Sequence, residues 1–162
     1  MIVKNIISNY GLKPHPEGGY YKISFWDSEE IPHFALPSEY AGPRAYMSSI
    51  LYLLPKKEKC IFHKIKMNEA WAFHAGGPLK LYQFSPTGET TEVILGSGIN
   101  ESVFHVVPKG FWMGALPSNS HDYSLISCIT APGFTPNDWM KGEKEDLIKK
   151  YPSHIDIIEM LT

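Results

Sequence analysis

Apolar and polar residues alternate with a period of two along most of the chain, which is the pattern of β-strands with one buried face. Within residues 20–26, Tyr21 and Phe25 fall on one face and Tyr20 and Trp26 on the other. Further strands are expected at residues 46–54, 61–65, 70–74, 79–84, 91–95, 103–107, 111–116 and 122–131. Short strands separated by turn signals about every 8–12 residues indicate a sandwich or a barrel. Because a closed barrel leaves no sheet edge exposed, we predict an all-β barrel.

Helical periodicity is confined to the two ends of the chain. Ile2, Ile6 and Ile7 recur at helical spacing before Gly11, which predicts a short N-terminal cap helix. Two more helices, packed outside the barrel, are expected at residues 144–150 and 153–161. The chain ends therefore flank the strands rather than interrupt them.

The longest interruption of the strand pattern is residues 27–43, which hold three prolines and indicate a long surface loop. Loops of this length often cover a binding site, although some are simply mobile. No internal repeat, low-complexity tract or linker divides the chain. We therefore predict that residues 1–162 form a single domain.

The composition favours a small-molecule-binding protein over one that binds nucleic acid or a membrane. Aromatic residues make up 13% of the chain and often line small-molecule pockets. A formal charge of −2 argues against nucleic-acid binding, and no run approaches the roughly 18 apolar residues of a membrane span. The N-terminus shows no secretion signal, and Cys60 and Cys128 lie in apolar runs as reduced residues. We therefore expect a cytoplasmic protein.

Glu69 is the most informative candidate for chemistry. On a strand it shares a face with Trp71 and Phe73, and desolvation beside these rings would raise its pKa and suit it to proton transfer. If residues 66–68 form a tight hairpin, His63 lies across from Glu69. Such a pair could ligate a metal, act as a base and its orienting group, or be a satisfied buried pair. The alternative for Glu69 is an exposed position or a salt bridge to Arg44.

Other residues are candidates for holding a ligand in the barrel. Tyr20 follows two glycines at the expected barrel rim and could act as a general acid, although it or Tyr21 could equally serve packing. Arg44 could bind a carboxylate or phosphate, or pair with Glu17 or Glu69. The remaining ligand-binding candidates are Trp71, Phe73, His105, Trp112 and Met113.

Two partial motifs in the chain resemble those of the cupin superfamily. His63, Glu69 and Gly76 match the spacing of its first motif, but Ile65 occupies the second histidine position. The second motif keeps its proline and glycine, whereas Met113 replaces its histidine. The resemblance implies a double-stranded β-helix, or jelly-roll, barrel.

A closer resemblance covers nearly the whole chain. The segments 14–21, 50–54, 68–71, 74–76, 107–112 and 131–134, together with Arg44 and Phe62-His63, are similar to a small uncharacterised family known as the fifth cupin class. The resemblance implies a barrel that is usually dimeric and is similar to sugar-nucleotide epimerases and germin-type proteins. Two positions depart from that family: Ala72 stands where relatives tend to have histidine, and His105 where they tend to have glutamine.

A dedicated metal centre is not expected from these motifs. Of the four usual ligand positions only His63 and Glu69 remain, whereas a catalytic zinc or iron site needs about three protein ligands. Strand alternation directs His74 away from Glu69, and the reach of His105 is open. We expect no firm cofactor, and at most weak binding of a divalent metal through His63 and Glu69.

Three functions remain compatible with these residues. The first is a metal-independent isomerase or epimerase for a sugar- or polyol-like molecule, with His63 as base, Glu69 as orienter or second acid–base group and Tyr20 or Tyr21 as acid. In that hypothesis Arg44 would hold an anionic group of the substrate. The second is a ligand-binding or sensing protein without catalysis, and the third is a metal-dependent dioxygenase or isomerase. The expected partners are a small molecule and, by the resemblance, a second copy of the chain.

Overall fold

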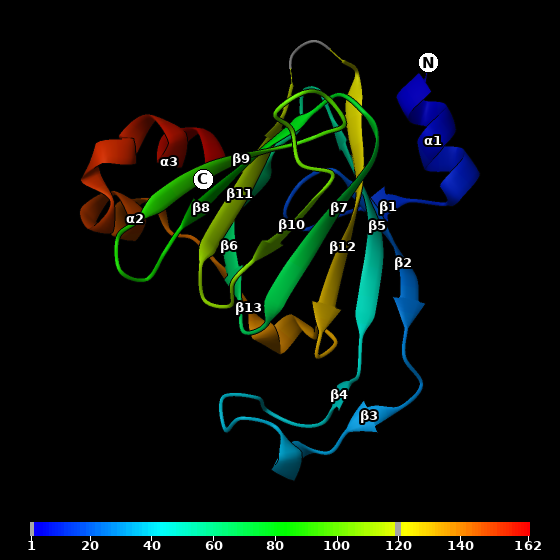
Figure 1. Ribbon diagram of the computed structural model, residues 1–162, viewed down its shortest axis with the longest axis vertical. Coiled ribbons are helices and arrows are strands. Elements are labelled where there is room, and N and C mark those ends of the chain that lie inside the picture. Colours follow the sequence, from blue (N-terminus) through cyan, green and yellow to red (C-terminus); the bar gives the residue numbers. More distant parts are fainter. Residues whose placement is uncertain (1, 119–120) are drawn as a thin grey trace.

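Two antiparallel β-sheets face each other across the interior of the protein (Figure 1). The computed structural model describes residues 2–118 and 121–162. The six-stranded sheet has the order β1 (Lys13–Pro14), β2 (Tyr20–Trp26), β5 (Ser48–Pro55), β12 (Tyr123–Ala131), β7 (Asn68–Gly76) and β10 (Phe104–Val107). The five-stranded sheet has the order β13 (Trp139–Lys141), β6 (Cys60–Ile65), β11 (Trp112–Pro117), β8 (Leu79–Phe84) and β9 (Thr90–Leu95). This jelly-roll arrangement confirms the predicted all-β fold.

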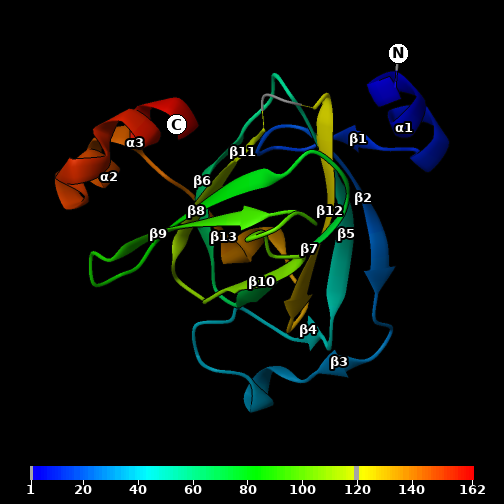
Figure 2. The same ribbon diagram turned by 45° about the horizontal axis from the view of Figure 1, so that its top comes forward.

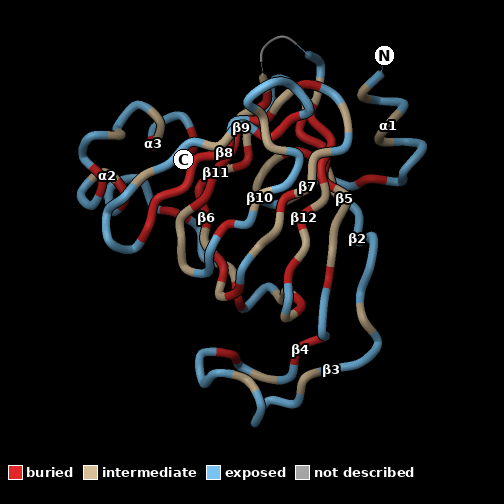
Figure 3. Tube along the Cα trace, viewed as in Figure 1, coloured by how far each residue is buried: buried red, intermediate tan, exposed pale blue. Residues whose placement is uncertain are grey.

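The strands bury their apolar faces against each other between the sheets. Tyr52, Trp71 and Ile126 of the six-stranded sheet share one buried cluster with Leu81 and Met113 of the five-stranded sheet. Each such side chain contributes roughly 1.5–3 kcal/mol when it is fully removed from water. Figure 3 shows the resulting distribution, with buried segments concentrated along the strands and exposed ones at the chain ends and in the excursion around β3. The period-two pattern of the sequence therefore reflects the facing sheets.

Short helices cover the outer faces of the two sheets (Figure 2). Helix α1 (Ile2–Tyr10) packs Ile6 and its neighbours against Leu53 on the six-stranded sheet. Helices α2 (Lys144–Lys150) and α3 (Ile155–Leu161) pack against Phe62 and Phe84 on the five-stranded sheet. Short 3-10 helices occur at His33–Ala35, Pro136–Asp138 and Pro152–His154. The predicted cap helix and external C-terminal helices are confirmed, and none of the described helices is long and apolar enough to cross a membrane.

The long loop lies outside the barrel, below the two main sheets in Figure 1. It contains β3 (Glu30–Ile31), which pairs with β4 (Arg44–Ala45) in a small separate ladder. Tyr40 of this loop is buried against the interior cluster and donates a hydrogen bond to the carbonyl of Lys66. The loop is therefore fastened to the barrel, but none of its residues lines the cavity described below.

The expected hairpin between His63 and Glu69 is wrong. Strand β6 pairs with β11 and β13, whereas β7 pairs with β12 and β10, so the chain crosses from one sheet to the other between them. Met67 lies within this crossing, and its side chain is 2% exposed. The buried methionine side chain anchors the crossing segment in the interior. His63 and Glu69 consequently approach one cavity from opposite sheets rather than as neighbours in one sheet.

Candidate active site

A cavity of about 450 Å³ lies between the two sheets, within the size range of small-molecule sites. Its walls are mostly apolar and aromatic. The lining residues are His15, Pro16, Glu17, Tyr21, Ile23, Trp26, Ser48, Ser49, Ile50, Tyr52, His63, Ile65, Glu69, Trp71, Cys128, Thr130, Phe134, Pro136 and Trp139. Ionisable side chains gather in this lining, which makes it the candidate site.

A second hollow of about 500 Å³ lies alongside β13 and is more open to solvent. Its exposed lysine, Lys109, pairs with Glu39 at 3.2 Å, and the partly buried Lys66 donates to the Glu39 carbonyl. Exposed ion pairs of this kind contribute little to stability. Three ionisable side chains whose pKa values burial shifts, Glu17, His63 and Glu69, line the first cavity, and that cavity is therefore the candidate site.

A tight turn before β2 brings His15 and Glu17 into the cavity. The amide of Gly18 donates to the carbonyl of His15 at 3.0 Å, and the amide of Ile61 donates to the carbonyl of Glu17 at 2.9 Å. Gly18 has a φ of +105°, and a Cβ there would overlap the carbonyl of Lys59. The turn is thus docked against the start of β6, and it requires glycine.

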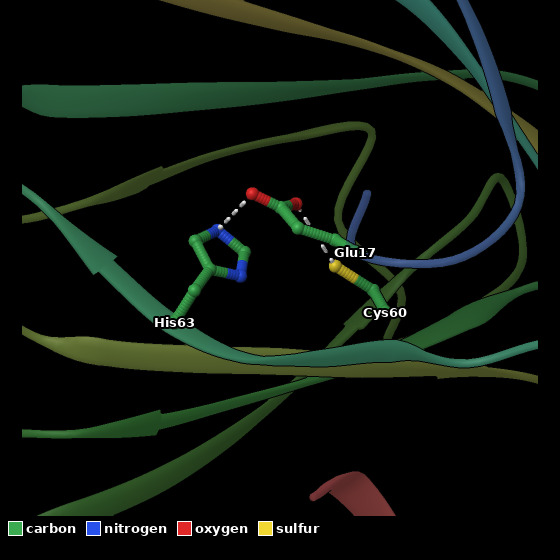
Figure 4. A group of neighbouring side chains, drawn as sticks. All are labelled: Glu17, Cys60 and His63. Carbon is green, nitrogen blue, oxygen red and sulfur yellow. Dashed lines mark hydrogen bonds and ion pairs between the residues drawn. The ribbon is translucent and has the colours of Figure 1, made fainter. Parts of the chain in front are cut away.

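Glu17, Cys60 and His63 converge at one end of the cavity (Figure 4). The Glu17 carboxyl lies between the other two: Cys60 Sγ donates to Oε2 at 3.5 Å, and His63 Nε2 lies 3.5 Å from Oε1. One ligand atom from each residue lies within 4.8 Å of the other two. The side chains of His63 and Glu17 are only 2% and 13% exposed, and Cys60 is fully buried. This group is called the Glu17–Cys60–His63 cluster below.

A β-bulge explains why Cys60 and His63 share a face. Met113 and Ala115 of β11 pair with His63 and Cys60 of β6, respectively. An interval of two residues on β11 is therefore matched by an interval of three on β6. Phe62 between them packs on the outer face, against Phe84. Strict alternation would have placed Cys60 and His63 on opposite faces, and for this reason the sequence pattern did not connect them.

The His63 ring is held in one orientation by the backbone. Nδ1 lies 2.9 Å from the Ile61 carbonyl, which can only accept, so Nδ1 carries the proton and the Nε2 lone pair faces Glu17. Burial lowers the pKa of His63, while the negative charge of Glu69 acts in the opposite direction. The ring is therefore neutral near pH 7. The expectation that Glu69 orients His63 is wrong, because the Ile61 carbonyl has that role.

Glu69 faces the cavity from β7 and accepts a hydrogen bond from the Trp71 indole at 2.9 Å. The expected shared face of these two residues is thereby confirmed. Burial raises the pKa of Glu69 to about 7, assisted by the charge of Glu17 and opposed by His63 and the Trp71 hydrogen bond. Near neutral pH this carboxyl is present in both protonation states.

His15 and Trp139 complete the polar end of the cavity. Burial raises the pKa of Glu17 and lowers that of His15, whose Nδ1 lies 3.7 Å from Glu17 Oε2. Trp139 lies close enough to lower the pKa of Glu17, but the two groups do not meet in hydrogen-bond geometry. The Trp139 indole N–H is consequently buried without a hydrogen-bond partner among the described residues.

The cavity has an acidic character. Among the described residues, its lining contains two carboxyl groups and two imidazoles but no lysine or arginine. The hydroxyls of Ser48 and Thr130 bond to each other at 3.0 Å, and Ser48 also accepts from the Phe134 amide. The polar groups that remain open to a ligand are therefore those around Glu17, Glu69 and Trp139.

Three of the nominated site residues, His63, Glu69 and Trp71, line the cavity. Tyr20 does not, because alternation along β2 turns it outward against α1 while Tyr21 faces inward. Of the two tyrosines considered as the acid, the structure therefore leaves Tyr21, and not Tyr20, in the cavity lining. His74 points away from the cavity, as expected, and bonds to Ser127 at 2.7 Å.

Arg44 also lies outside the cavity and is fully engaged elsewhere. Its Nε and Nη2 donate to the two carboxylate oxygens of Asp138 at 2.9 and 2.7 Å, and Nη1 donates to the carbonyls of Gly42 and Pro43. Arg44 is thus a structural ion pair rather than an anion-binding residue. Its partner is neither Glu17 nor Glu69, the two carboxylates that the sequence suggested.

The other four nominated ligand-binding residues also do not line the cavity. Met113 is 1% exposed within the interior cluster, and Phe73 packs against that cluster. Trp112 faces the C-terminal helices, with the Lys64 ammonium over its ring, and His105 bonds to the Gln83 side chain at 2.8 Å. Each of these side chains is held by packing or by a polar partner, so these nominations are corrected.

Sequence reasoning missed His15, Glu17 and Cys60 as site residues. The sequence places His15 in a loop without evident chemistry, offers Glu17 only as an ion-pair partner of Arg44, and predicts Cys60 as a reduced core or pocket-wall residue. A signal did exist, because the Pro- and Gly-rich segment 14–19 is part of the resemblance to a known family. Its position beside β6, however, depends on contacts between segments that are distant in sequence.

Comparisons with known proteins agree with this architecture. Residues 4–141 match the family described as Cupin superfamily (DUF985). A protein from Shewanella oneidensis of known crystal structure is 34% identical, with a TM-score of 0.87 over 98% of this chain and 96% of that one. A hypothetical protein from Leishmania major is 26% identical, with the same TM-score over 98% and 97% of the two chains.

A more distant likeness shows the fold alone. Oxalate decarboxylase from Bacillus subtilis is 15% identical, with a TM-score of 0.56 over 92% of this chain and 36% of that one. No curated protein matches the chain.

Proposed function

The chain belongs to the cupin superfamily, in the family described as DUF985, and we propose that its cavity binds a small organic molecule and transfers protons on it. The observation that carries the proposal is the placement of Glu69 in the wall of a mostly apolar cavity between the two sheets, with a pKa of about 7. A general acid–base group works best when its pKa lies near the working pH. Isomerisation or epimerisation is the class of reaction that such a group supports without another reactant.

The lining favours an uncharged substrate with hydroxyl groups, of sugar or polyol size. Aromatic walls such as Trp26 and Trp71 offer flat apolar surfaces, and a few polar groups suffice to orient a bound molecule. The anionic substrate suggested by Arg44 loses its support, because the Arg44–Asp138 pair lies elsewhere and no other cation replaces it in the described lining. Either carboxyl group, in its ionised form, would repel an anion.

The roles within the site follow from the hydrogen bonds. The Trp71 indole binds Glu69 Oε2 and leaves Oε1 available to a substrate proton. The unpartnered N–H of Trp139 is suited to binding a substrate oxygen, since a buried donor without a partner is costly. His63 and Glu17 provide a second polar contact point, and Tyr21 also lines the cavity.

Hydrogen exchange at carbon tests this proposal. The protein would be incubated in D₂O with a panel of aldoses, ketoses and polyols, and loss of C–H signals would be followed by proton NMR. We expect exchange in at least one compound and at least a hundredfold slower exchange in Glu69→Gln, within the range of general acid–base effects. Equal exchange in the variant would overturn the role of Glu69.

The same experiment separates catalysis from binding. Saturable binding of a panel compound without exchange would instead support a sensing or storage function. That alternative has support of its own, because the apolar walls and a few polar groups are sufficient for binding.

We also propose that two copies associate along β2. Strand β1 pairs only with Tyr20 and Tyr21, which leaves the outer edge of residues 23–26 without a described partner. Ile23, Phe25 and Trp26 are 50%, 45% and 48% exposed there. An exposed apolar edge strand is a template for pairing with another chain, and a second copy would also shield the cavity wall formed by Ile23 and Trp26.

A further inference from the structure

We infer that the Glu17–Cys60–His63 cluster binds a divalent transition metal, at a position different from the metal centre implied by the cupin motifs. The inference goes beyond the proposed function, because it stands or falls without reference to the proton transfer assigned to Glu69. It concerns side chains that meet at one end of the cavity wall (Figure 4).

The position implied by the family motifs does not fit a metal. Its four ligand positions correspond to His63, Ile65, Glu69 and Met113 in this chain. An isoleucine cannot ligate, and the Met113 thioether is buried in the apolar cluster. Two ligands are fewer than the three protein ligands of a typical catalytic site.

The Glu17–Cys60–His63 cluster restores the number of ligands to three. A metal bound at about 2.0–2.3 Å by tetrahedrally placed ligands holds their donor atoms roughly 3.5 Å apart. Glu17 Oε1 lies 3.5 Å from His63 Nε2, and Glu17 Oε2 lies 3.5 Å from Cys60 Sγ. The third pair, Cys60 and His63, has ligand atoms within 4.8 Å of each other, so small side-chain adjustments would bring all three groups to the spacing of a ligand set. The turn before β2 and the bulge in β6 hold them there.

The donor types indicate which metals would bind. A thiolate, an imidazole and a carboxylate together suit borderline ions such as Zn²⁺, Co²⁺ or Fe²⁺, and not Mg²⁺ or Ca²⁺. The bound metal deprotonates a coordinating thiol, so Glu17 and Cys60 would supply two negative charges to balance the ion. The described lining contains no lysine or arginine that could compete with the metal by forming an ion pair with Glu17 or Cys60.

The surroundings of His63 also favour ligation. Metal-binding histidines usually donate their second ring N–H to a carbonyl or carboxylate, which fixes the ring and its tautomer. The Nδ1–H of His63 already donates to the Ile61 carbonyl at 2.9 Å, and the Nε2 lone pair faces Glu17. Because Glu17 and His63 also line the cavity, a molecule bound there would have access to the metal.

Cobalt titration tests the inference directly. The protein, purified without a metal-affinity tag and dialysed against a chelator, would be titrated with Co²⁺ and followed by absorption spectroscopy. We expect one Co²⁺ per chain and an intense near-ultraviolet thiolate-to-cobalt charge-transfer band. Cys60→Ser should remove that band, whereas Cys128→Ser, at the other buried cysteine, which lines the cavity, should keep it.

Two carboxyl variants locate the site. Glu17→Gln should weaken Co²⁺ binding by more than about tenfold while the remaining complex keeps its charge-transfer band, and Glu69→Gln should bind Co²⁺ as the wild type does. The Glu17 variant also keeps the test decisive if Cys60→Ser fails to fold. Absence of Co²⁺ binding, a band that survives in Cys60→Ser, or loss of binding in Glu69→Gln alone would overturn the inference.

This titration needs no substrate, so its result is separate from that of the exchange experiment. Failure of the cobalt titration would leave the proton-transfer proposal intact. Failure of the Glu69→Gln exchange test would leave the metal site intact.

Discussion

The Nε2 atom of His63 lies 3.5 Å from the Glu17 carboxyl, although one residue belongs to a strand and the other to a turn that precedes the first long strand of the barrel. The two are brought together by the Ile61 amide, which binds the Glu17 carbonyl at 2.9 Å, and by glycines that allow the turn. The polar end of the cavity therefore depends on a contact between backbone segments as much as on the ionisable side chains themselves.

The turn that carries Glu17 should be intolerant of any side chain at Gly18. Gly18→Ala would drive a methyl group into the Lys59 carbonyl in addition to straining a backbone with φ of +105°. Gly88→Ala is the matched control, since Gly88 has a φ of +102° but open space around it. We expect the control to cost about 1 kcal/mol and Gly18→Ala at least twice as much, measured by urea unfolding. Equal losses would show that the turn is not docked as described.

The buried Arg44–Asp138 pair should matter more for stability than any surface pair. Arg44→Met leaves a buried carboxylate without its partner, which costs about 3–5 kcal/mol. Lys80→Met, which breaks a pair whose side chains are 50% and 40% exposed, should cost less than about 1 kcal/mol. Chemical denaturation of both variants compares them, and a loss below about 1 kcal/mol in Arg44→Met would contradict the structural role assigned to this pair.

The Arg44–Asp138 pair should also influence the cavity from a distance. Asp138 accepts hydrogen bonds from the amide and hydroxyl of Thr135, which orders the segment that presents Phe134 and Trp139 to the cavity. We expect a folded Arg44 variant to bind a cavity ligand more weakly than the wild type does, as measured by calorimetry. Unchanged affinity would show that the segment keeps its place without the pair.

The sequence predicted the fold well because the fold rests on repeated local patterns. The period-two alternation located β2 at residues 20–26 and β8 at residues 79–84 with the bounds that the structure gives. The same alternation predicted that Glu69 and Trp71 share one face of their strand, where the structure joins them by a hydrogen bond. Local pattern also predicted the raised pKa of Glu69, because two aromatic neighbours on one strand face imply desolvation.

The rest of the site could not be predicted because it depends on irregularities and long-range contacts. The bulge in β6 places Cys60 and His63 on one face against the alternation, and nothing in the local pattern marks it. The crossing between β6 and β7 replaced the expected hairpin. The sequence predicted for Arg44 either an anionic ligand or a pair with Glu17 or Glu69, because its actual partner, Asp138, is distant in sequence and lies in a segment without periodicity.

Association of two copies should be sensitive to a charge on β2. Phe25→Lys places an ammonium on the exposed edge without altering a cavity-lining residue, and we expect it to convert the dimer to a monomer. Phe34→Lys is the control, because Phe34 is 91% exposed but lies in the loop outside the barrel. Light scattering after size-exclusion chromatography measures both. A wild-type monomer, or a dimer that survives Phe25→Lys, would contradict an interface at β2.

Stability of the metal-free protein should fall as pH rises through neutrality, because of Glu69. A carboxyl whose pKa is raised from 4.5 to about 7 binds its proton more tightly in the folded state, so its contribution is complete below pH 4.5 and is lost as pH rises through 7. Glu69→Gln cannot ionise, and above pH 7 it should be more stable than the wild type by up to about 3 kcal/mol. Urea unfolding at pH 5 and pH 8 tests this; an equal effect of the substitution at both values would contradict it.

The proposed proton transfer requires that Glu69 exchange its proton with solvent or substrate near neutral pH. The most direct measurement is an NMR titration of the ¹³C-labelled side-chain carboxyl of Glu69 in metal-free protein, with its signal assigned by its absence in Glu69→Gln. A midpoint near 7 is the expected result and would place an acid–base group at working pH inside the cavity. A midpoint near the ordinary value of 4.5 would mean that Glu69 is permanently ionised, and the proposed proton transfer would lose its basis.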